Sequence, residues 1–495
     1  MFCGKVFLLL LATAAINAQV KSDTNTNLRV LIFPYIPDLN KDGLASLRNH
    51  IKREFEAKNT DITLVVEGDS LHNLYNLENM RQYLGTGPSA FDVAEVDMIL
   101  LGEMANENLL EPNPDPSIQV DSSSFFPFAV NAVTYGGTTY GIPTLVCANF
   151  LAKMTSPTGS GTLQLIGNFR GSWTLPGYYL SAYVNAYGAS FMYEGVNSDP
   201  NYHEDVVNSI KQLSDRCLRS DGSNPCTNRY YRSEPEKMTE DVIRSKESHF
   251  LAYVEVIGEV MHRNPDVEVE SIAPPPLGGS ERYLQMYTDA LVANRNTYQS
   301  KKEAIKRFME FYTSDDFRQS YAFCGDMVGE GDISCTRYVL PANTNFYQSS
   351  RVKENSLYQQ LYGIMNDRGI SAPNSELYDR REYLDTTLST MLKYDKKEHN
   401  HNHYHDHQHN YNHYHDHQHN HNHYLTTNTT TTTTMTTNTT TTTTMTTNTT
   451  TTTTMTTNTT TTTTMTTNTT TTTTTYKYYV HPPEKTYTVK TALLG

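Results

Sequence analysis

The stretch that decides the fold is Leu28-Arg29-Val30-Leu31-Ile32-Phe33, which runs into Pro34-Tyr35-Ile36-Pro37-Asp38. The first six residues are rich in β-formers and predict a strand buried on both faces. Two prolines then force an irregular turn. The elements expected next are a helix over 44–55, a strand over 61–66, a strand over 91–97 and a helix over 98–110. This alternation of strand and helix predicts an α/β fold with a parallel sheet covered on both faces.

In such folds, ligands bind beyond the carboxyl ends of the strands. The segment 34–38 and Asp97 each follow a strand, so both are expected to face one crevice. Asp97 could equally cap the helix after it, which is the commoner role of a carboxylate at such a junction.

Further along the chain, the pattern predicts two buried carboxylates on strands. Glu255 falls in a strand expected over 250–256, and Asp289 falls in a strand expected over 284–292. A buried ionised carboxylate is costly without a partner. Each is therefore either paired structurally or has a raised proton affinity suited to acid–base work. The other expected elements are helices over 205–217, 240–248, 301–312 and 379–394, and a segment over 272–279 that crosses between lobes.

Length and composition limit the classes of protein to which the chain can belong. The chain has 495 residues, and much of its last fifth is of low complexity, so roughly 370 residues remain for about two domains. Residues 1–18 have Lys5, an apolar run and small residues before Gln19, which is typical of a signal peptide. The apolar run is too short to span a bilayer, which takes about 20 apolar residues, and no later segment reaches that length. We therefore expect a secreted, extracellular protein without a membrane partner. The net charge of −14 argues against a nucleic-acid partner.

Cysteine usage singles out one residue. Of six cysteines, Cys3 lies in the expected leader, and four are spaced for local disulfides, Cys217 with Cys226 and Cys324 with Cys335. Cys147 is left over, in Tyr140-Gly141-Ile142-Pro143-Thr144-Leu145-Val146-Cys147-Ala148-Asn149-Phe150, which reads as a strand that ends at an edge or cleft. An odd cysteine in a secreted protein is a free reactive thiol or an intermolecular link. The alternative is a buried, inert thiol.

Several stretches together resemble one enzyme family. The helix over 302–311 in a two-lobed α/β chain is similar to extracellular solute-binding proteins, and the match sharpens to thiamine pyridinylase (thiaminase I) on that scaffold. The stretches that carry it are Phe33-Pro34-Tyr35-Ile36-Pro37-Asp38, Phe91-Asp92-Val93-Ala94-Glu95-Val96-Asp97, the cysteine stretch, and Tyr253-Val254-Glu255 with Tyr287-Thr288-Asp289. The resemblance covers about residues 28–361. It implies a two-lobed periplasmic-binding-protein-like (type II) region over 28–395, with a cleft between the lobes.

The resemblance also implies roles for individual residues. The family's nucleophile falls on Cys147 and its catalytic base on Glu255. The positions that match substrate-contacting carboxylates and tyrosines are Asp97, Asp289, Tyr35, Tyr83, Tyr253 and Tyr287. Two departures are that Phe33 replaces a tyrosine, and that a cleft tyrosine has no clear counterpart around 229–236, where Tyr230 and Tyr231 are shifted.

The implied reaction explains the residue types. A cysteine thiolate adds to the pyrimidine of thiamine, the thiazole leaves as a neutral group, and an amine or thiol then displaces the cysteine. A free thiol has a pKa of about 8.5, so a neighbouring base raises its reactivity. The scheme needs neither a metal nor an organic cofactor, and we expect a monomer. The alternative functions are a non-catalytic extracellular thiamine- or solute-binding protein, and a matrix protein whose tail is the functional part.

The end of the chain is expected to be a disordered, low-complexity tail. Residues 396–424 are histidine-rich, which suits loose binding of zinc, copper or nickel or no role, and 476–495 are too short to interpret. Residues 425–475 are a threonine-rich repeat of ten-residue period. Asn-Thr-Thr sequons in it begin at Asn428, Asn438, Asn448, Asn458 and Asn468. They indicate a glycosylated stalk, or else a neutral repeat expansion.

Overall fold

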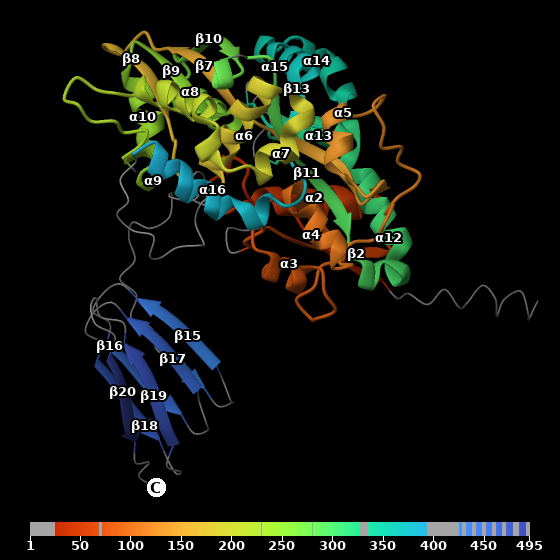
Figure 1. Ribbon diagram of the computed structural model, residues 1–495. Helices are drawn as coiled ribbons and strands as arrows, with labels where there is room; N and C mark the ends of the chain where they lie inside the picture. Colours follow the sequence, from red (N-terminus) through yellow and green to blue (C-terminus); the bar gives the residue numbers. More distant parts are fainter. Residues whose placement is uncertain are drawn as a thin grey trace, which may run out of the picture. The chain divides into compact units, whose positions relative to one another are not determined.

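The structure is a computed structural model that describes residues 25–68, 72–228, 230–279, 281–326 and 335–393, together with short strands between 425 and 491 (Figure 1). The chain divides into two compact units, residues 1–415 and 416–495. The signal peptide predicted over 1–18 and the histidine-rich tract lie outside the described residues.

The first lobe of the larger unit is built on a seven-stranded sheet. Its order is β12-β6-β11-β3-β1-β2, and β13 also pairs with β11. The strands are β1 (Thr26–Leu31), β2 (Ile62–Glu67), β3 (Val93–Asp97), β6 (Gly141–Cys147), β11 (Leu284–Ala293), β12 (Leu340–Pro341) and β13 (Gly369–Ser371). β1 is parallel to β2 and β3, whereas β11 is antiparallel to both β3 and β6. The sheet is thus mixed. The predicted parallel pairing holds for β1–β3 and for the pair β11–β13, whereas β6 pairs antiparallel with both β11 and β12.

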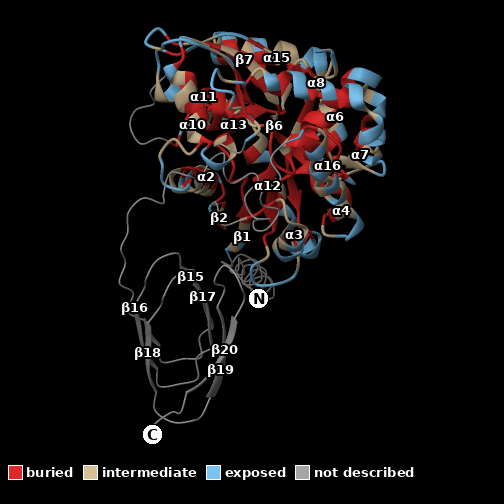
Figure 2. Cartoon of the chain, turned by 60° about the vertical axis from the view of Figure 1, so that its left-hand side comes forward, coloured by how far each residue is buried: buried red, intermediate tan, exposed pale blue. Residues whose placement is uncertain are grey.

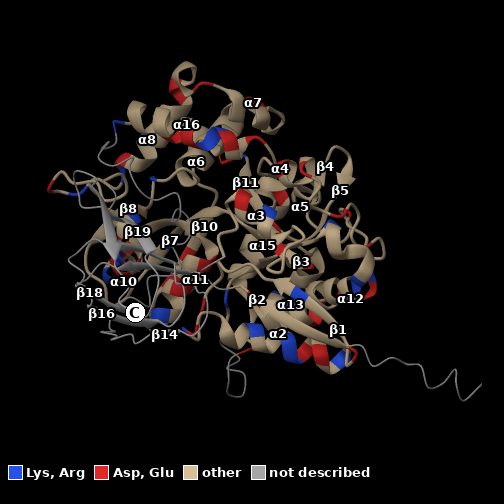
Figure 3. Cartoon of the chain, turned by 90° about the horizontal axis from the view of Figure 1, so that it is seen from below, with Lys and Arg blue, Asp and Glu red and all other residues tan. Residues whose placement is uncertain are grey.

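Amphipathic helices cover this sheet. α2 (Ala45–Lys58) packs on β2, and α12 (Arg295–Thr313) packs on β1, β6 and β11. The other helices outside the second lobe are α3 (Leu77–Tyr83), α4 (Leu101–Asn106), α5 (Pro127–Ala132), α13 (Asp315–Ala322), α14 (Ser350–Lys353) and α15 (Ser356–Arg368). The buried residues gather on the strands and on the inward faces of the helices (Figure 2). Charged side chains lie on outer helices such as α2 and α16 (Leu377–Met391) (Figure 3).

The second lobe has a four-stranded sheet of order β10-β7-β9-β8. These strands are β7 (Asn149–Thr155), β8 (Thr162–Gly167), β9 (Glu247–Tyr253) and β10 (Glu268–Ala273). The accompanying helices are α6 (Thr174–Tyr187), α7 (Met192–Asn197), α8 (Glu204–Asp215), α9 (Tyr230–Ser233), α10 (Glu236–Arg244) and α11 (Val254–Arg263). α10 and α11 pack against this sheet, and α6 packs against α7, α8 and α16.

The chain passes from one sheet to the other directly after the predicted site residue Cys147. β6 ends at Cys147, and after the buried Ala148 the chain enters β7 of the other sheet. It returns through the segment between β10 and β11, which overlaps the crossing predicted over 272–279 except for the first two residues, which belong to β10. Before β6, the turn at Gly136 and Gly137 joins the two-residue strands β4 (Thr134–Tyr135) and β5 (Thr138–Thr139). Both glycines have positive φ, 57° and 78°, as a tight two-residue hairpin requires.

Two predicted elements are displaced, and one displacement concerns a site residue. The helix predicted over 240–248 is α10, which ends at Arg244. The strand predicted over 250–256 is β9, which starts at Glu247 and ends at Tyr253. Glu255 therefore lies in the first turn of helix α11 and not in a strand. The apolar run of the strand continues without interruption into the apolar face of the helix, so periodicity alone could not separate them.

The smaller unit contains the threonine-rich repeat. Its described residues form β14 (Leu425–Thr427), β15 (Thr432–Thr437), β16 (Thr442–Thr447), β17 (Thr452–Thr457), β18 (Thr462–Thr467), β19 (Thr472–Tyr478) and β20 (Lys485–Thr491). β15 pairs with β17, and β16 with β14 and β18, in parallel, two repeats apart. The sequence predicts disorder over this tail. Threonine is β-branched and favours extended backbone, which accounts for the strands that are described. All five sequon asparagines lie outside the described residues.

Within the described part of the chain, no helix is long and apolar enough to cross a membrane.

Candidate functional site

Strand register brings four predicted site residues together at one end of the first sheet. Cys147, the last residue of β6, lies opposite Tyr287 of β11. Asp289, two residues further along β11, lies opposite Asp97 on β3 and Leu145 on β6. Side chains two apart on a strand share a face, and directly opposed residues have Cβ atoms about 5 Å apart. The thiol and the two carboxylates are therefore close neighbours on one face.

The second lobe contributes the remaining catalytic candidate. Tyr253 ends β9, where it pairs with Asn149, two residues beyond Cys147. Glu255 follows in the first turn of α11 and is only 8% exposed. The strand crossing after Cys147 and the strand-to-helix junction at Tyr253 thus lie side by side. This places the acid–base candidate and the thiol in the same pocket.

That pocket contains about 690 Å³ of space free of protein atoms, part of it open solvent. Its lining residues come from both lobes: Phe33, Tyr35, Ile36, Tyr75, Asp97, Ile99, Leu145, Cys147, Trp173, Tyr253, Glu255, Tyr287 and Asp289. Lys, Arg and His are absent from these described lining residues. The functional groups that line the pocket are a thiol, three carboxylates and a set of aromatic rings.

Aromatic side chains form one wall. The ring of Tyr35 lies 5.2 Å from Phe33, edge-on, and 5.5 Å from Tyr75, measured between centroids. Tyr75 in turn lies 5.5 Å from Trp173 of the second lobe. Trp173 is backed by the Arg381 guanidinium of α16, 4.6 Å from the ring centroid. The wall therefore continues across the cleft from one lobe to the other.

Asp97 both caps the helix that follows it and faces the pocket, which are the two roles that its sequence position allowed. Its Oδ1 accepts a hydrogen bond from the backbone N–H of Ile99 at 3.0 Å and so caps the short 3-10 helix Met98–Leu100. Its Oδ2 faces the pocket and accepts a hydrogen bond from the Tyr75 hydroxyl at 3.2 Å. Burial raises the pKa of Asp97 to about 6, against the lowering effect of these two hydrogen bonds.

Asp289 is a buried carboxyl that lies opposite another one, Asp97. It is 4% exposed, and burial, followed by the charges of Asp97, Glu95 and Glu255, raises its pKa well above the ordinary value. Glu95 is buried on the same strand as Asp97, but it is occupied by structural hydrogen bonds from the Phe33 N–H at 3.1 Å and the Tyr312 hydroxyl at 2.7 Å. Burial therefore disfavours the ionised forms of Asp97 and Asp289, whereas positive charge nearby would favour them.

The pKa values of the Cys147 thiol and of the neighbouring Glu255 carboxyl are both raised. Burial raises the pKa of the Cys147 thiol well above its usual range, and Asp289, Glu255 and Asp97 raise it further. Burial raises the pKa of Glu255 to about 7, opposed by a hydrogen bond from its own backbone N–H. The Oε2 atom of Glu255 is buried without a hydrogen-bond partner among the described residues. A carboxylate that titrates near neutrality, with one oxygen free, is suited to accept a proton.

No group of three or more His, Cys, Asp or Glu side chains arranged to hold a metal ion occurs in the described part of the chain. Cys147 is free, whereas the other described cysteines form the two disulfides expected from their spacing, Cys217–Cys226 and Cys324–Cys335.

Some predicted site residues lie elsewhere. The ring of Tyr83 packs against His72 and Phe91, at 5.5 and 5.9 Å, and does not line the pocket. Tyr75 and Trp173 do line it, although the sequence analysis singled out neither for the site. Trp173 is the only tryptophan of the chain, which was the one signal available.

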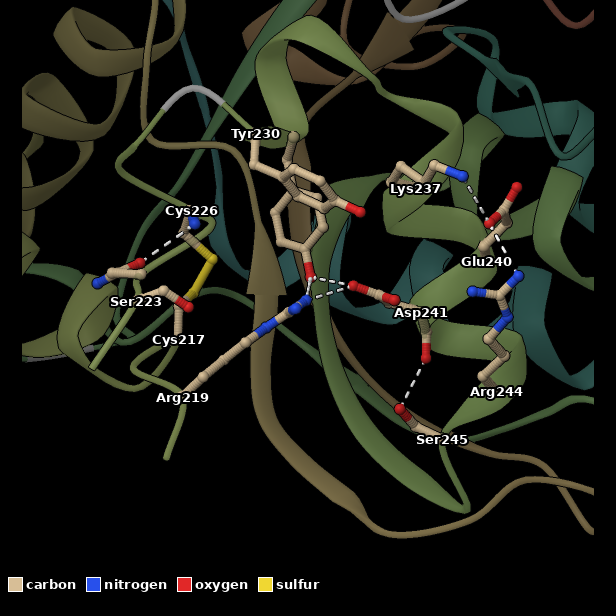
Figure 4. Close-up of polar contacts among 12 residues, drawn as sticks. Cys217, Arg219, Ser223, Cys226, Tyr230, Lys237, Glu240, Asp241, Arg244 and Ser245 are labelled. Atoms are coloured by element: carbon tan, nitrogen blue, oxygen red, sulfur yellow. Dashed lines mark hydrogen bonds and ion pairs between the residues drawn. A yellow bond between two sulfur atoms is a disulfide. The ribbon is translucent and has the colours of Figure 1, made fainter. Parts of the chain in front are cut away.

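The shifted tyrosines near residue 230 are structural. Tyr231 is buried, accepts a hydrogen bond from Arg219 at 3.1 Å and donates one to Asp241 at 2.7 Å. Arg219 and Asp241 also form an ion pair with an N–O distance of 2.6 Å (Figure 4). The Tyr230 ring lies 5.9 Å from the same guanidinium. Neither tyrosine lines the pocket.

Comparison with known proteins identifies the fold. No protein-family model matches the chain, and a search of curated proteins found no match. Among solved structures, the chain is similar to Clostridium botulinum thiaminase I in complex with thiamin, with 16% identity, a TM-score of 0.53 and coverage of 74% of this chain and 100% of that one. It is also similar to thiaminase I from Bacillus thiaminolyticus (17% identity, TM-score 0.50, 74% and 99% coverage) and to maltose-bound T. maritima MalE3 (16%, 0.53, 74% and 98%). The protein thus has the two-lobed α/β fold that thiaminase I structures and maltose-binding proteins share.

Proposed function

We propose that this protein is a secreted transferase that degrades thiamine. The observation that carries the proposal is the pocket itself, where Cys147 and Glu255 lie with Asp97 and Asp289 and no cationic side chain is among the described lining. Thiamine joins an aminopyrimidine to a positively charged thiazolium, so it supplies both the cation that buried carboxylates attract and an electrophile for the thiol.

In the first step, the Glu255 carboxylate accepts the proton of the Cys147 thiol, and the thiolate sulfur forms a bond to a carbon of the pyrimidine ring. The bond between the bridging methylene and the thiazolium nitrogen then breaks, and its electron pair leaves with the thiazole, which becomes neutral. The raised pKa of the thiol opposes this step in the empty pocket. A bound thiazolium lowers that barrier, because positive charge nearby favours the thiolate.

The aromatic wall holds the two rings. Stacking against a tyrosine or tryptophan face attracts a cation by about 0.5–2 kcal/mol. Phe33 retains such a face without a hydroxyl, and it packs edge-on against Tyr35. In the second step, an amine or thiol bonds to the methylene carbon, and the electron pair of the C–S bond returns to Cys147. No metal or organic cofactor takes part in this scheme.

The expected leader and the two disulfides support export, since disulfides persist in oxidising compartments.

A second candidate function is a non-catalytic thiamine- or solute-binding protein. The shared fold with a maltose-bound protein and the strongly disfavoured thiolate of Cys147 both favour it.

Intact-protein mass spectrometry separates the two candidates. With thiamine and no acceptor, the transferase accumulates a pyrimidine adduct on the peptide that contains Cys147 and releases one equivalent of thiazole. The Cys147→Ser variant should form no adduct. Thiamine binding without adduct or thiazole release would instead identify a binding protein.

A further inference from the structure

The segment that follows β1 carries three of the residues that line the pocket: Phe33, Tyr35 and Ile36. It also contains Pro34 and Pro37, and proline has no backbone N–H to donate. The segment therefore has fewer backbone hydrogen bonds with which to hold its own shape, so other parts of the chain must fix it. We call residues 33–37 the aromatic turn.

Buried charged side chains from outside the pocket hold both ends of the aromatic turn. At its start, Glu95 Oε2 accepts a hydrogen bond from the Phe33 N–H at 3.1 Å. At its end, Arg337 Nε donates a hydrogen bond to the Pro37 carbonyl at 3.3 Å. Neither Glu95 nor Arg337 is more than 2% exposed, and neither lines the pocket. Each of them therefore acts on the pocket through the turn.

The Arg337 guanidinium joins the aromatic turn to two other segments. Its Nη2 donates to Asp326 Oδ2 at 2.7 Å, and its Nη1 lies 2.6 Å from Asp326 Oδ1 in a buried ion pair. Its Nη1 also donates to the Tyr321 carbonyl in the last turn of α13 at 2.9 Å. Asn40, three residues beyond the aromatic turn, donates to the same Asp326 Oδ2 at 3.1 Å. Both charges of a buried pair lose their hydration, so the pair depends on a geometry that the rest of the structure must hold.

A disulfide holds this geometry. Cys324 and Cys335 are bonded to each other, Asp326 is two residues after the first of them, and Arg337 is two residues after the second. The disulfide and the ion pair thus join the same two segments side by side. A cross-link excludes conformations in which the two segments are apart. Reduction of the disulfide removes that restriction and leaves the ion pair to hold the segments.

We propose that Arg337 is a positioning residue for thiamine binding and that the Cys324–Cys335 disulfide switches it on. This rests on the function proposed above. A dithiol reductant passes two electrons and two protons to the disulfide, so the S–S bond breaks, two cysteine thiols form and the reductant becomes a disulfide. Asp326 and Arg337 then separate, the Pro37 carbonyl loses its donor, and the aromatic wall loosens. Thiamine binding is therefore weak in a reducing compartment and strong in an oxidising one, where disulfides persist.

The single tryptophan of the chain supplies a direct readout. The Trp173 ring lies 5.5 Å from Tyr75, which lies 5.5 Å from Tyr35, so its fluorescence reports on the aromatic wall. Binding is measured in the Cys147→Ser chain, because dithiothreitol is itself a thiol that could accept the pyrimidine. In calorimetry, dithiothreitol should raise Kd for thiamine roughly tenfold, with the number of binding sites per chain unchanged, and should shift the tryptophan emission to longer wavelength.

The second described disulfide provides a matched control. A chain with Cys217→Ser and Cys226→Ser retains the switch, so its Kd should respond to dithiothreitol as before. A chain with Cys324→Ser and Cys335→Ser should bind thiamine weakly with and without the reductant. Should that chain not fold, the first variant gives the same test alone, because Cys324–Cys335 is the only disulfide left among its described residues.

Arg337→Lys tests the positioning role without a reductant. Lysine keeps a positive charge opposite Asp326 but lacks the planar fork that also reaches Pro37 and Tyr321. In the otherwise unchanged chain, KM for thiamine should rise roughly tenfold, with the single-turnover release of thiazole at saturating thiamine unchanged. An unchanged KM in folded Arg337→Lys would overturn the positioning role.

The switch has its own contradicting results. With both disulfides shown by mass spectrometry to be reduced, an unchanged Kd and an unchanged emission contradict it, as does a response that disappears in the chain with Cys217→Ser and Cys226→Ser. A loss of binding sites at constant Kd would show that the disulfide only stabilises the fold, and this also contradicts the switch. If no form of the protein binds thiamine, the proposed function has failed, and the emission of Trp173 still decides whether the aromatic wall responds to reduction.

Discussion

Replacing Glu255 with glutamine should lower turnover, and its effect on the stability of the fold should depend on pH. Glu255 is 8% exposed, and burial raises its pKa from 4.5 to about 7. The folded protein therefore binds this proton more tightly than the unfolded chain does. The group's contribution to stability is fully present below pH 4.5 and is lost as the pH rises through 7.

The magnitude follows from the pKa. A pKa difference of one between the folded and unfolded states changes the free energy of unfolding by about 1.4 kcal/mol. The full rise in the pKa of Glu255 therefore corresponds to about 3 kcal/mol, and about 2.5 kcal/mol of this is lost between pH 5 and pH 8. Glutamine does not titrate. One polar atom of its amide takes the place of Oε2, which has no hydrogen-bond partner, and this unpaired buried group costs about 1–3 kcal/mol at every pH. The difference between the two pH values is therefore the informative quantity.

Urea unfolding of the ligand-free wild type and of Glu255→Gln at pH 5 and pH 8 measures it. The free energy of unfolding of the variant, relative to the wild type, should increase by about 2.5 kcal/mol from pH 5 to pH 8. The same preparations should show turnover reduced by roughly 10²–10⁴-fold, the usual contribution of a general base, with thiamine affinity nearly unchanged. In the wild type, the release of thiazole should rise with pH through about 7.

Glu259→Gln, one turn further along α11 and outside the pocket, is the control and should keep full activity. An equal difference in stability at both pH values would refute the reasoning about burial. A parallel loss of turnover and thiamine binding would refute the role as base.

Three other perturbations have defined outcomes. Asp289→Asn removes a buried negative charge, so calorimetry should show thiamine affinity reduced by roughly tenfold or more, with little change for an uncharged thiamine analogue; equal losses for both ligands would contradict an electrostatic role. Trp173→Ala should raise Kd for thiamine roughly tenfold with kcat nearly unchanged, and Trp173→Phe should restore most of the affinity, whereas no change in Kd would remove Trp173 from the binding wall. A chain that ends at Lys397 should have the kcat and KM of the full chain within about twofold, because every pocket residue precedes it; loss of activity would assign a function to the tail.

Much of the scaffold could be predicted from sequence because its signals are local. The run of β-formers at 28–33 and the helical spacing at 44–55 correspond to β1 and α2 within a few residues. The direction of β11 was not predictable in this way, because a strand's pattern is the same whether its neighbours run parallel or antiparallel. That direction sets the pairing of Asp289 with Asp97 and of Tyr287 with Cys147.

Part of the pocket was predictable because a residue type was unusual for its surroundings, and the family resemblance added Tyr35, Tyr253 and Tyr287. A lone cysteine after a buried run and carboxylates in apolar segments pointed to Cys147, Asp97 and Asp289. Tyr75 carried no such signal, since it is one of 34 tyrosines and reaches the pocket from the loop before α3. Tyr83 is partly buried as well, but it packs against His72 and Phe91 and does not line the pocket.

The central claim is that Cys147 attacks thiamine in this pocket. Its most direct test is the loss of thiamine with aniline or pyridine as acceptor, measured for the wild type and for Cys147→Ser. We predict turnover by the wild type and none by the variant, which should still bind thiamine. Equal turnover by both proteins, or thiamine binding without turnover in either, would contradict the claim.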